Sequence, residues 1–190
     1  MNRSEFLRTT SQLACASCIA LAFGSSADAA ETPPATTTPV DEALQRARDE
    51  NQFVNNWLSD LFEAIDQEVD PTARVKLLEA CGRGCYRRHS FKQDIAAAGR
   101  GNPAKLIEAY RQNFIIEREG TLVHIIYGGN KCYCPAARNR PARPNDLHCE
   151  CTRASHEAIF EAALGRRIPV KLVETVRRGG WRCHLVVDLA

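Results

Sequence analysis

The chain has 190 residues, of which 44% are apolar and 25% are charged, an ordinary composition for a globular protein. Its 25 basic and 23 acidic side chains leave a formal net charge of only +2, which argues against the basic surface that nucleic-acid binding requires. Beyond the N-terminus no run of 18 apolar residues occurs, so the sequence predicts no membrane span in the mature chain.

Residues 1–29 have the three parts of an export signal peptide. A short polar region carries Arg3, an apolar stretch runs from Leu13 to Phe23, and Ala27-Asp28-Ala29 matches a cleavage site. We expect cleavage near Ala30 and a periplasmic protein, with a lipoprotein or an uncleaved anchor as alternatives. The polar region resembles a twin-arginine motif with Ser4 in place of the second arginine, so the general secretory and twin-arginine routes both stay open.

Residues 30–40 form a Pro/Thr-rich linker that is too polar to pack. The rest, 41–190, has the length of a single domain. Its first part, up to residue 69, has apolar side chains every three or four positions, which predicts a long amphipathic helix. Asp70-Pro71 and Asn102-Pro103 each join a capping side chain to a proline at the first helical position, so we expect two further helices to begin there.

The second half changes to the alternating pattern of strands. Residues 114–118 and 121–127 predict one hairpin, and residues 170–176 and 181–189 predict a second. A helix is expected between them, over residues 152–164. Helices followed by antiparallel hairpins predict an α+β fold, with N-terminal helices packed on one face of an antiparallel sheet made of two hairpins.

Cysteines give the most informative pattern. Seven lie after the expected cleavage site, as one C-x-x-x-C pair on a predicted helix, two C-x-C pairs around an arginine-rich loop, and a last single residue: Cys81, Cys85, Cys132, Cys134, Cys149, Cys151 and Cys183. Paired thiols around a short loop can hold a metal, and the pattern favours zinc over an iron–sulfur cluster. An oxidising compartment favours disulfides instead, although the odd number leaves one thiol over. Simple buried thiols are the third alternative.

The C-terminal third resembles two known families. The residues that carry the resemblance are Cys132-Tyr133-Cys134-Pro135, Cys149-Glu150-Cys151 before a helix, Arg178-Gly179-Gly180, and Cys183-His184. Their order resembles the end of the L-2-amino-thiazoline-4-carboxylate hydrolase-like family and, more distantly, the 4-vinyl-reductase-type small-molecule-binding domain. The first resemblance implies hydrolysis of a small cyclic or amide substrate. The second implies binding of a small ligand without turnover.

The second resemblance also implies a zinc site. In some domains of that type zinc is held by a cysteine before the helix, a glutamate on the next strand and cysteines at the following turn. The matching residues here are Cys151, Glu174 and Cys183, and the remaining position falls near Arg177. Independently of the resemblance, Glu174 shares a face with apolar residues, so its burial requires a metal or an arginine beside it.

Two histidines lie close to these thiols in the sequence. His148, before the second C-x-C pair, and His156, on the helix that follows, are candidate ligand-binding or acid/base groups, and Arg177 completes the candidate ligand-binding set. The loop before them carries further arginines but only one nearby aromatic residue, so we expect a solvated loop or an anion clamp rather than a nucleic-acid surface.

Together these features predict an exported, cysteine-rich domain that binds a small ligand, a metal such as zinc, or both, through clustered thiols. A hydrolase of a small cyclic or amide substrate and a disulfide-stabilised binding domain without metal are the alternatives. No catalytic residue can be assigned, because no nucleophile and base stand at a recognisable spacing. Enzyme activity and oligomeric state therefore stay open.

Overall fold

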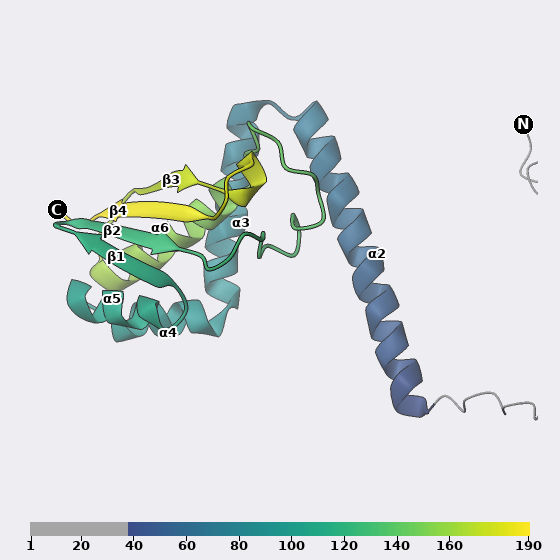
Figure 1. Ribbon diagram of the computed structural model, residues 1–190, viewed down its shortest axis with the longest axis horizontal. Coiled ribbons are helices and arrows are strands. Elements are labelled where there is room, and N and C mark those ends of the chain that lie inside the picture. Colours follow the sequence, from purple (N-terminus) through teal and green to yellow (C-terminus); the bar gives the residue numbers. More distant parts are fainter. Residues whose placement is uncertain (1–37) are drawn as a thin grey trace, which may run out of the picture. The chain divides into compact units, whose positions relative to one another are not determined.

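The structure, a computed structural model, describes residues 38–190, so the expected signal peptide and most of the linker lie outside the described residues. Helix α2 (Pro39–Glu68) opens this part of the chain (Figure 1). The last two residues assigned to the linker, Pro39 and Val40, are therefore helical, because proline is tolerated in the first turn, where its missing N–H has no partner to lose. α2 and every later element lie in one unit, Pro39–Ala190.

Two of the next three helices begin where the Asx-Pro pairs predict. In α3 (Pro71–Arg88), the Asp70 carboxylate accepts two backbone N–H groups of the first turn, at 3.0 and 3.1 Å. In α5 (Pro103–Arg111), the Asn102 side chain accepts one such group at 3.1 Å. These bonds satisfy amides that have no partner within the helix. The short helix between them, α4 (Ser90–Ala98), was not predicted from the sequence.

Two antiparallel hairpins pair side by side into a four-stranded sheet. The strands are β1 (Ile115–Glu119), β2 (Leu122–Ile126), β3 (Val170–Glu174) and β4 (His184–Asp188). Their order in the sheet is β1-β2-β4-β3, so the hairpins join through β2 and β4. Helix α6 (Glu150–Leu164) connects the hairpins along the chain, and a 3-10 turn, η1 (Val176–Arg178), follows β3.

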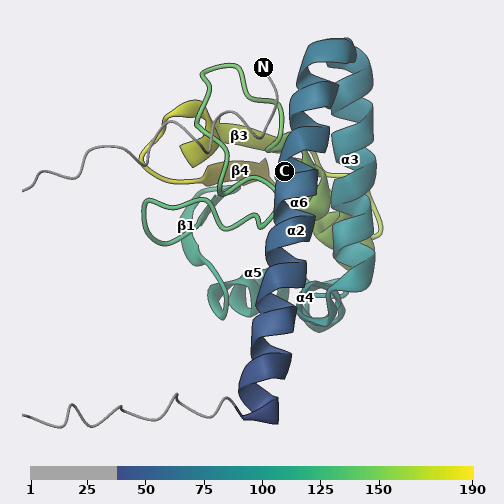
Figure 2. The same cartoon turned by 90° about the vertical axis from the view of Figure 1, so that its right-hand side faces the viewer.

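Alternating burial along the strands places one face of the sheet against the helices. Alternate side chains of β2 and β4 are buried, among them Val123, Ile125 and Leu185, because successive side chains in a strand point to opposite faces. They share one hydrophobic core with Phe160 of α6 and Tyr110 of α5, and Figure 2 shows these helices beside the sheet. The predicted α+β fold is confirmed.

Helices α3 and α6 approach closely at Gly82. A Cβ atom placed on Gly82 would lie 2.1 Å from the carbonyl oxygen of Cys151 and 3.0 Å from the Cβ of Ala154. Only glycine allows two backbones to come this near. The contact sets Cys85, one helical turn further along α3, beside the start of α6.

The long loop between β2 and α6 is held by ion pairs of three arginines, of which Arg177 and Arg140 are buried. Arg177 forms an ion pair with Asp146, and both side chains are only 2% exposed. Arg140 pairs with Asp66 of α2, and Arg143 pairs with a second carboxylate of that helix at 2.6 Å. The protein's own carboxylates therefore occupy Arg140 and Arg143, which argues against an anion clamp there. Arg138 is exposed, as expected of a solvated loop.

Candidate functional site

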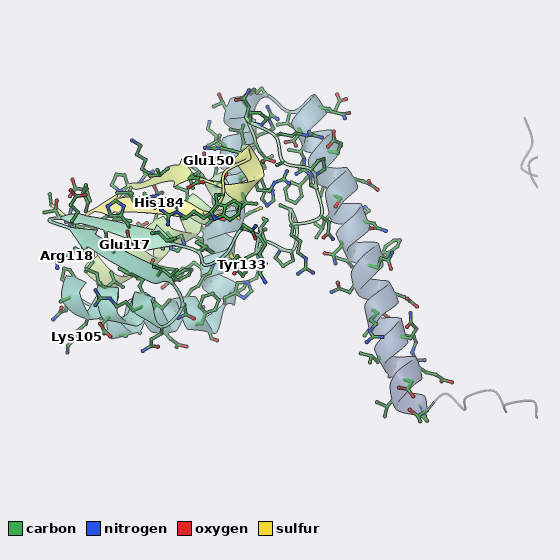
Figure 3. All side chains as sticks on the ribbon, viewed as in Figure 1. Lys105, Glu117, Arg118, Tyr133, Glu150 and His184 are labelled. Carbon is green, nitrogen blue, oxygen red and sulfur yellow. The ribbon has the colours of Figure 1, made fainter. Side chains whose placement is uncertain are left out.

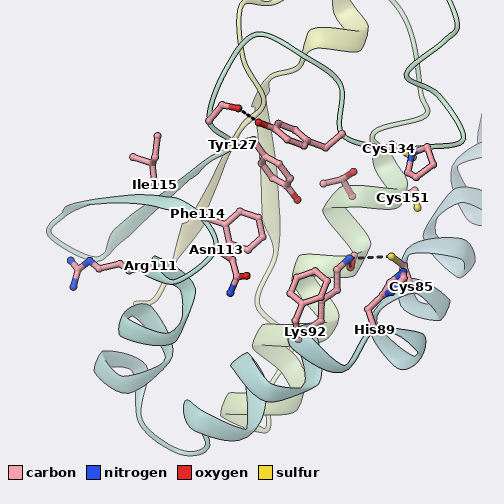
Figure 4. Close-up of a pocket in the computed structure, with 16 residues that line it drawn as sticks. Cys85, His89, Lys92, Arg111, Asn113, Phe114, Ile115, Tyr127, Cys134 and Cys151 are labelled. Carbon is pink, nitrogen blue, oxygen red and sulfur yellow. Dashed lines mark hydrogen bonds between the residues drawn. The ribbon is translucent and has the colours of Figure 1, made fainter.

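A pocket of about 700 Å³ lies among the helices and the ends of the first hairpin. Its walls come from the end of α3, the start of α4, the α5–β1 connection, the segment after β2 and the start of α6 (Figure 4). Pockets for small ligands range from about 300 to 1,000 Å³, so its size suits one. The lining surface is mainly apolar, and six of the 16 lining residues are aromatic or aliphatic: Phe91, Phe114, Ile115, Tyr127, Tyr133 and Pro135.

The central polar group of this pocket, here called the Lys92 pocket, is the Lys92 ammonium. It donates hydrogen bonds to the Cys85 sulfur at 3.1 Å and to the Ser155 hydroxyl at 2.7 Å. A second cation in the wall, Arg111, already pairs with Glu108 at 2.9 Å. No aspartate or glutamate stands among the described residues that line the pocket. The site is therefore an apolar chamber with an ammonium group in its wall.

Three of the predicted thiols reach the Lys92 pocket: Cys85, Cys134 and Cys151. Burial raises the pKa of Cys134, and it raises that of Cys151 to about 12, because a thiolate loses its hydration there. These two thiols stay protonated at neutral pH and behave as small apolar side chains. Cys85 differs from them through its contact with Lys92.

A second cavity, of about 30 Å³, shares Tyr127, Tyr133, Cys134 and Thr152 with the Lys92 pocket. It has room for about one water molecule and none for an organic ligand. Four more predicted site residues line it: Cys132, His148, Cys149 and Cys183. Burial raises the pKa of Cys149 to about 12, so this thiol is also protonated at neutral pH.

His148 lies against Cys134 in the small cavity. Its Nε2 is 3.3 Å from the Cys134 sulfur, and the ring of Phe62 stands edge-on at 4.7 Å. Burial lowers the pKa of His148 to about 4, so the imidazole is neutral at pH 7. Its Nδ1 is buried and has no partner within the described residues. The third group that orients a catalytic base in a thiol–imidazole pair is therefore missing from this part of the chain.

His156 lies in the core behind the Lys92 pocket. The hydroxyl of Tyr110 is 3.1 Å from its Nδ1, and that of Tyr127 is 2.9 Å from its Nε2. A neutral imidazole donates from one nitrogen and accepts at the other, so both tyrosines are satisfied. Burial lowers the pKa of His156 to about 3. The structure links this residue to the pocket through Tyr127 and through the ring of Phe114, which stands edge-on to the imidazole at 5.4 Å.

Two predicted metal ligands lie away from both cavities. Glu174 accepts the backbone N–H of Trp181 at 2.5 Å and of Arg182 at 3.3 Å, and the Arg182 guanidinium lies 3.7 Å away. Of the two companions expected for this carboxylate, metal or arginine, the arginine is the one present. Cys81 is exposed on α3.

The predictions of metal binding and of disulfides are wrong for residues 38–190. In that range no group of three or more His, Cys, Asp or Glu side chains could hold a metal ion, and all seven cysteines are free. The reason lies in the direction of the thiols. One member of each C-x-C pair borders the Lys92 pocket and the other does not, and Glu174 is engaged by a turn. The predicted metal set is therefore divided: Cys132, Cys134, Cys149 and Cys183 line the small cavity without forming such a group, Cys85 and Cys151 border the Lys92 pocket, and Cys81 and Glu174 lie away from both.

Sequence reasoning missed the two polar partners at the centre of the Lys92 pocket. Lys92 belongs to α4, which follows His89 directly and lacks the Asx-Pro start signal of its neighbours. Ser155 lies inside the expected helix 152–164 and is 2% exposed. A small hydroxyl on the buried face of a helix was the one available signal, since it needs a partner there.

Comparison with known proteins gives a likeness of fold. No family model and no curated protein matches the chain. Among solved structures, it is similar to trafficking protein particle complex subunit 3 from Naegleria fowleri, a crystal structure with palmitic acid covalently bound. The TM-score is 0.51 at 13% sequence identity, and the match covers 75% of this chain and 96% of that chain. At this identity the likeness concerns the fold alone. The resemblance to the hydrolase-like and 4-vinyl-reductase-type families stays a prediction.

Proposed function

We propose that the domain binds a small, mainly apolar molecule with an acidic group, such as a fatty acid or an aromatic carboxylate, in the Lys92 pocket. One observation carries the proposal. The ammonium of Lys92 stands in the wall of an aromatic pocket of about 700 Å³ whose described lining contains no carboxylate. A ligand of this class places its apolar body on the rings and its carboxylate on the ammonium.

The charge of Lys92 supports an acidic head group. An ammonium has three donors, and the described residues supply two acceptors, the Cys85 sulfur and the Ser155 hydroxyl. The described lining of the pocket contains no carboxylate to pair with the ammonium. A partly buried cation without a counter-charge loses hydration that neutral acceptors only partly replace. A carboxylate from the ligand would take the third donor and neutralise the charge.

The solved neighbour supports an acyl chain as one form of the apolar body. In the Naegleria fowleri subunit a protein of similar fold holds palmitic acid in covalent form, so a fold of this kind can accommodate a long hydrocarbon chain. In this chain Cys85 is the thiol beside the pocket cation. An acyl group attached to it as a thioester would no longer carry the carboxylate that pairs with Lys92, so the proposal concerns the acid bound without a covalent bond.

Binding without turnover is favoured over hydrolysis by the state of the thiols. Cys134 has the imidazole contact that a nucleophile needs, but burial raises its pKa. His148 is neutral, and its Nδ1 has no hydrogen-bond partner among residues 38–190. The hydrolase alternative stays a prediction from the family resemblance.

The test uses displacement of the fluorescent probe 1-anilinonaphthalene-8-sulfonate from the full-length chain. Dodecanoate is compared with dodecanol, which has the same apolar body without the charge. We expect dodecanoate to bind roughly 10- to 100-fold more tightly, since a hydrogen bond to a charged group contributes about 1.5–3 kcal/mol. Intact-mass spectrometry of the purified protein detects an acyl group already attached to a thiol.

Variants locate the binding. Lys92→Met should remove the preference for the acid, whereas Lys171→Met, an exposed lysine on β3, should leave it unchanged. Thr152→Phe places a ring in the pocket wall and should weaken both ligands. Urea unfolding of each variant confirms that it folds. Equal preference for the acid in the unmodified chain and in Lys92→Met would rule the proposal out.

A further inference from the structure

Helix α2 carries an apolar face that the described part of the chain leaves uncovered. None of its 30 residues is buried, and Figure 3 shows its side chains projecting along its length. Six large apolar side chains on it are exposed, two of them aromatic: Val40, Leu44, Phe53, Val54, Trp57 and Leu61. An uncovered apolar surface of this extent marks an interaction site in a soluble domain.

The residues of α2 follow a heptad repeat. Spacings of three and four alternate over three heptads at positions a and d: Leu44, Ala47, Asn51, Val54, Leu58, Leu61 and Ile65. Trp57 occupies position g and widens the apolar face. This is the pattern of a helix that packs along a second helix in a coiled coil.

Contacts of α2 with its own unit use other positions of the heptad. Phe62, at e, packs on the His148 ring and lies under the Arg140 guanidinium. Glu63, at f, and Asp66, at b, form the ion pairs with the loop arginines. The exposed a, d and g residues Leu44, Val54, Trp57 and Leu61 are therefore left for another helix, while Leu58 and Ile65 are already partly covered.

We propose that α2 is a dimerisation helix that pairs in parallel with α2 of a second copy of this chain. Asn51 indicates that the two helices run parallel to each other. A single asparagine at an a position in an apolar seam favours two strands in one register, because the two amides then meet across the seam. Within its own helix the Asn51 oxygen accepts from Asn55 at 2.6 Å, so its NH2 group is left to donate to the partner copy.

The charges of α2 favour a second copy over a lipid surface. The helix contains eight acidic and two basic residues, whereas helices that lie on membranes are rich in lysine and arginine. No charged residue occupies an a or d position between Leu44 and Ile65. The acidic groups therefore stay in water when two such helices pair.

The area is sufficient for a stable pair. The seam spans 22 residues, which corresponds to about 33 Å of helix. An aromatic side chain buries about 150–250 Å². With Trp57 and the aliphatic seam residues of both copies, the contact reaches on the order of 1,000 Å², the size expected of a specific interface.

Sedimentation velocity of the full-length chain over a concentration series tests the pairing. We expect a dimer that Val54→Asp weakens at least about tenfold, since a carboxylate at position d would be buried in the seam. Asn56→Asp introduces the same charge at position f of the same helix and should leave the dimer unchanged. Both positions are exposed, so neither change removes a contact within the described part of the chain.

Cysteine cross-linking tests the parallel direction. In an in-register parallel pair, Ala47→Cys faces its own copy and should form a disulfide-linked dimer under mild oxidation. Asn56→Cys, on the opposite face, should not. A chain that stays monomeric, a dimer insensitive to Val54→Asp, or a monomer that instead binds lipid vesicles would each overturn the proposal. A dimer that Ala47→Cys does not link would overturn the parallel arrangement.

Discussion

Replacing Gly82 by alanine tests the close contact that positions the Lys92 pocket. Gly82 lies in α3 where this helix meets α6, three residues before Cys85. The added methyl carbon would stand 2.1 Å from the Cys151 carbonyl oxygen, and such contacts are essentially never seen below 3.0 Å. The two helices would have to separate by about 1 Å, and they are packed through backbone that has no flexible end to move aside.

Two opposing effects set the expected change in the free energy of unfolding. Overpacking of a rigid contact costs about 1–3 kcal/mol, and a backbone clash belongs at the upper end. Alanine in place of glycine in a helix gains about 0.8–1.0 kcal/mol. We therefore expect Gly82→Ala to lower the free energy of unfolding by about 2 kcal/mol, which corresponds to a fall of about 4–8 °C in melting temperature for a chain of this length.

Gly84→Ala is the matched control in the same helix. The nearest atom to its added carbon is Nη1 of Arg88, at 3.1 Å, the end of a side chain that can move aside. The gain in helix propensity should then dominate, and the unfolding free energy should rise by up to about 1 kcal/mol. Urea unfolding measures both variants. Equal stability of Gly82→Ala and the unmodified chain would refute the reasoning about the contact.

Two further predictions concern titratable groups. Burial lowers the pKa of His156 to about 3 and of His148 to about 4, against an ordinary value of 6.5. As the pH falls, the unfolded chain therefore takes up protons before the folded one does. The free energy of unfolding should fall below pH 6.5 by about 1.4 kcal/mol per pH unit for each histidine, down to about pH 4. Urea unfolding that gives the same free energy at about pH 7.5 and pH 5 would contradict this. Iodoacetamide at about pH 8 should label the exposed Cys81 before Cys149 and Cys151, because burial raises the pKa of the last two to about 12. Peptide mass mapping measures the order of labelling. Early labelling of Cys149 would contradict the prediction, because it would show an accessible thiolate.

Elements with local signals were predictable from the sequence. Asp70 and Asn102 cap the helices that follow them with bonds spanning two or three residues, so sequence spacing alone places those starts. The second hairpin illustrates the limit. Its last strand begins at His184 rather than at the expected residue 181, because the N–H groups of Trp181 and Arg182 are bound by Glu174 and do not join the ladder.

The candidate site was less predictable because its contacts are distant in sequence. Lys92 and Ser155 are 63 residues apart, and nothing in either local sequence indicates the other. The C-x-C pairs located the thiols but not their directions, which depend on how the loop between β2 and α6 is held. That loop is fixed by Arg177 and Asp146, two residues 31 positions apart. The spacing of the cysteines in the sequence therefore suggested one metal cluster. In the folded chain, packing divides these thiols between two cavities.

The buried pair of Arg177 and Asp146 should control both stability and ligand binding. Arg177 also donates to the backbone carbonyl oxygens of Ala137 and Arg140 in the loop, and this loop supplies part of the wall of the Lys92 pocket. Removing one member of a buried ion pair leaves an uncompensated charge and costs about 3–5 kcal/mol.

We expect Arg177→Met and Asp146→Asn each to destabilise the fold by about that amount. Their combination should cost less than the sum of the two, because the remaining partner is no longer a buried charge. Arg138→Met, an exposed arginine of the same loop, is the control and should change stability by less than about 0.5 kcal/mol. The single variants that remain folded should also bind dodecanoate more weakly, since the wall that carries Cys134 loses its support. A loss below about 1 kcal/mol in both single variants, with dodecanoate affinity unchanged, would show that the loop is held by its other contacts and that the pocket does not depend on this pair.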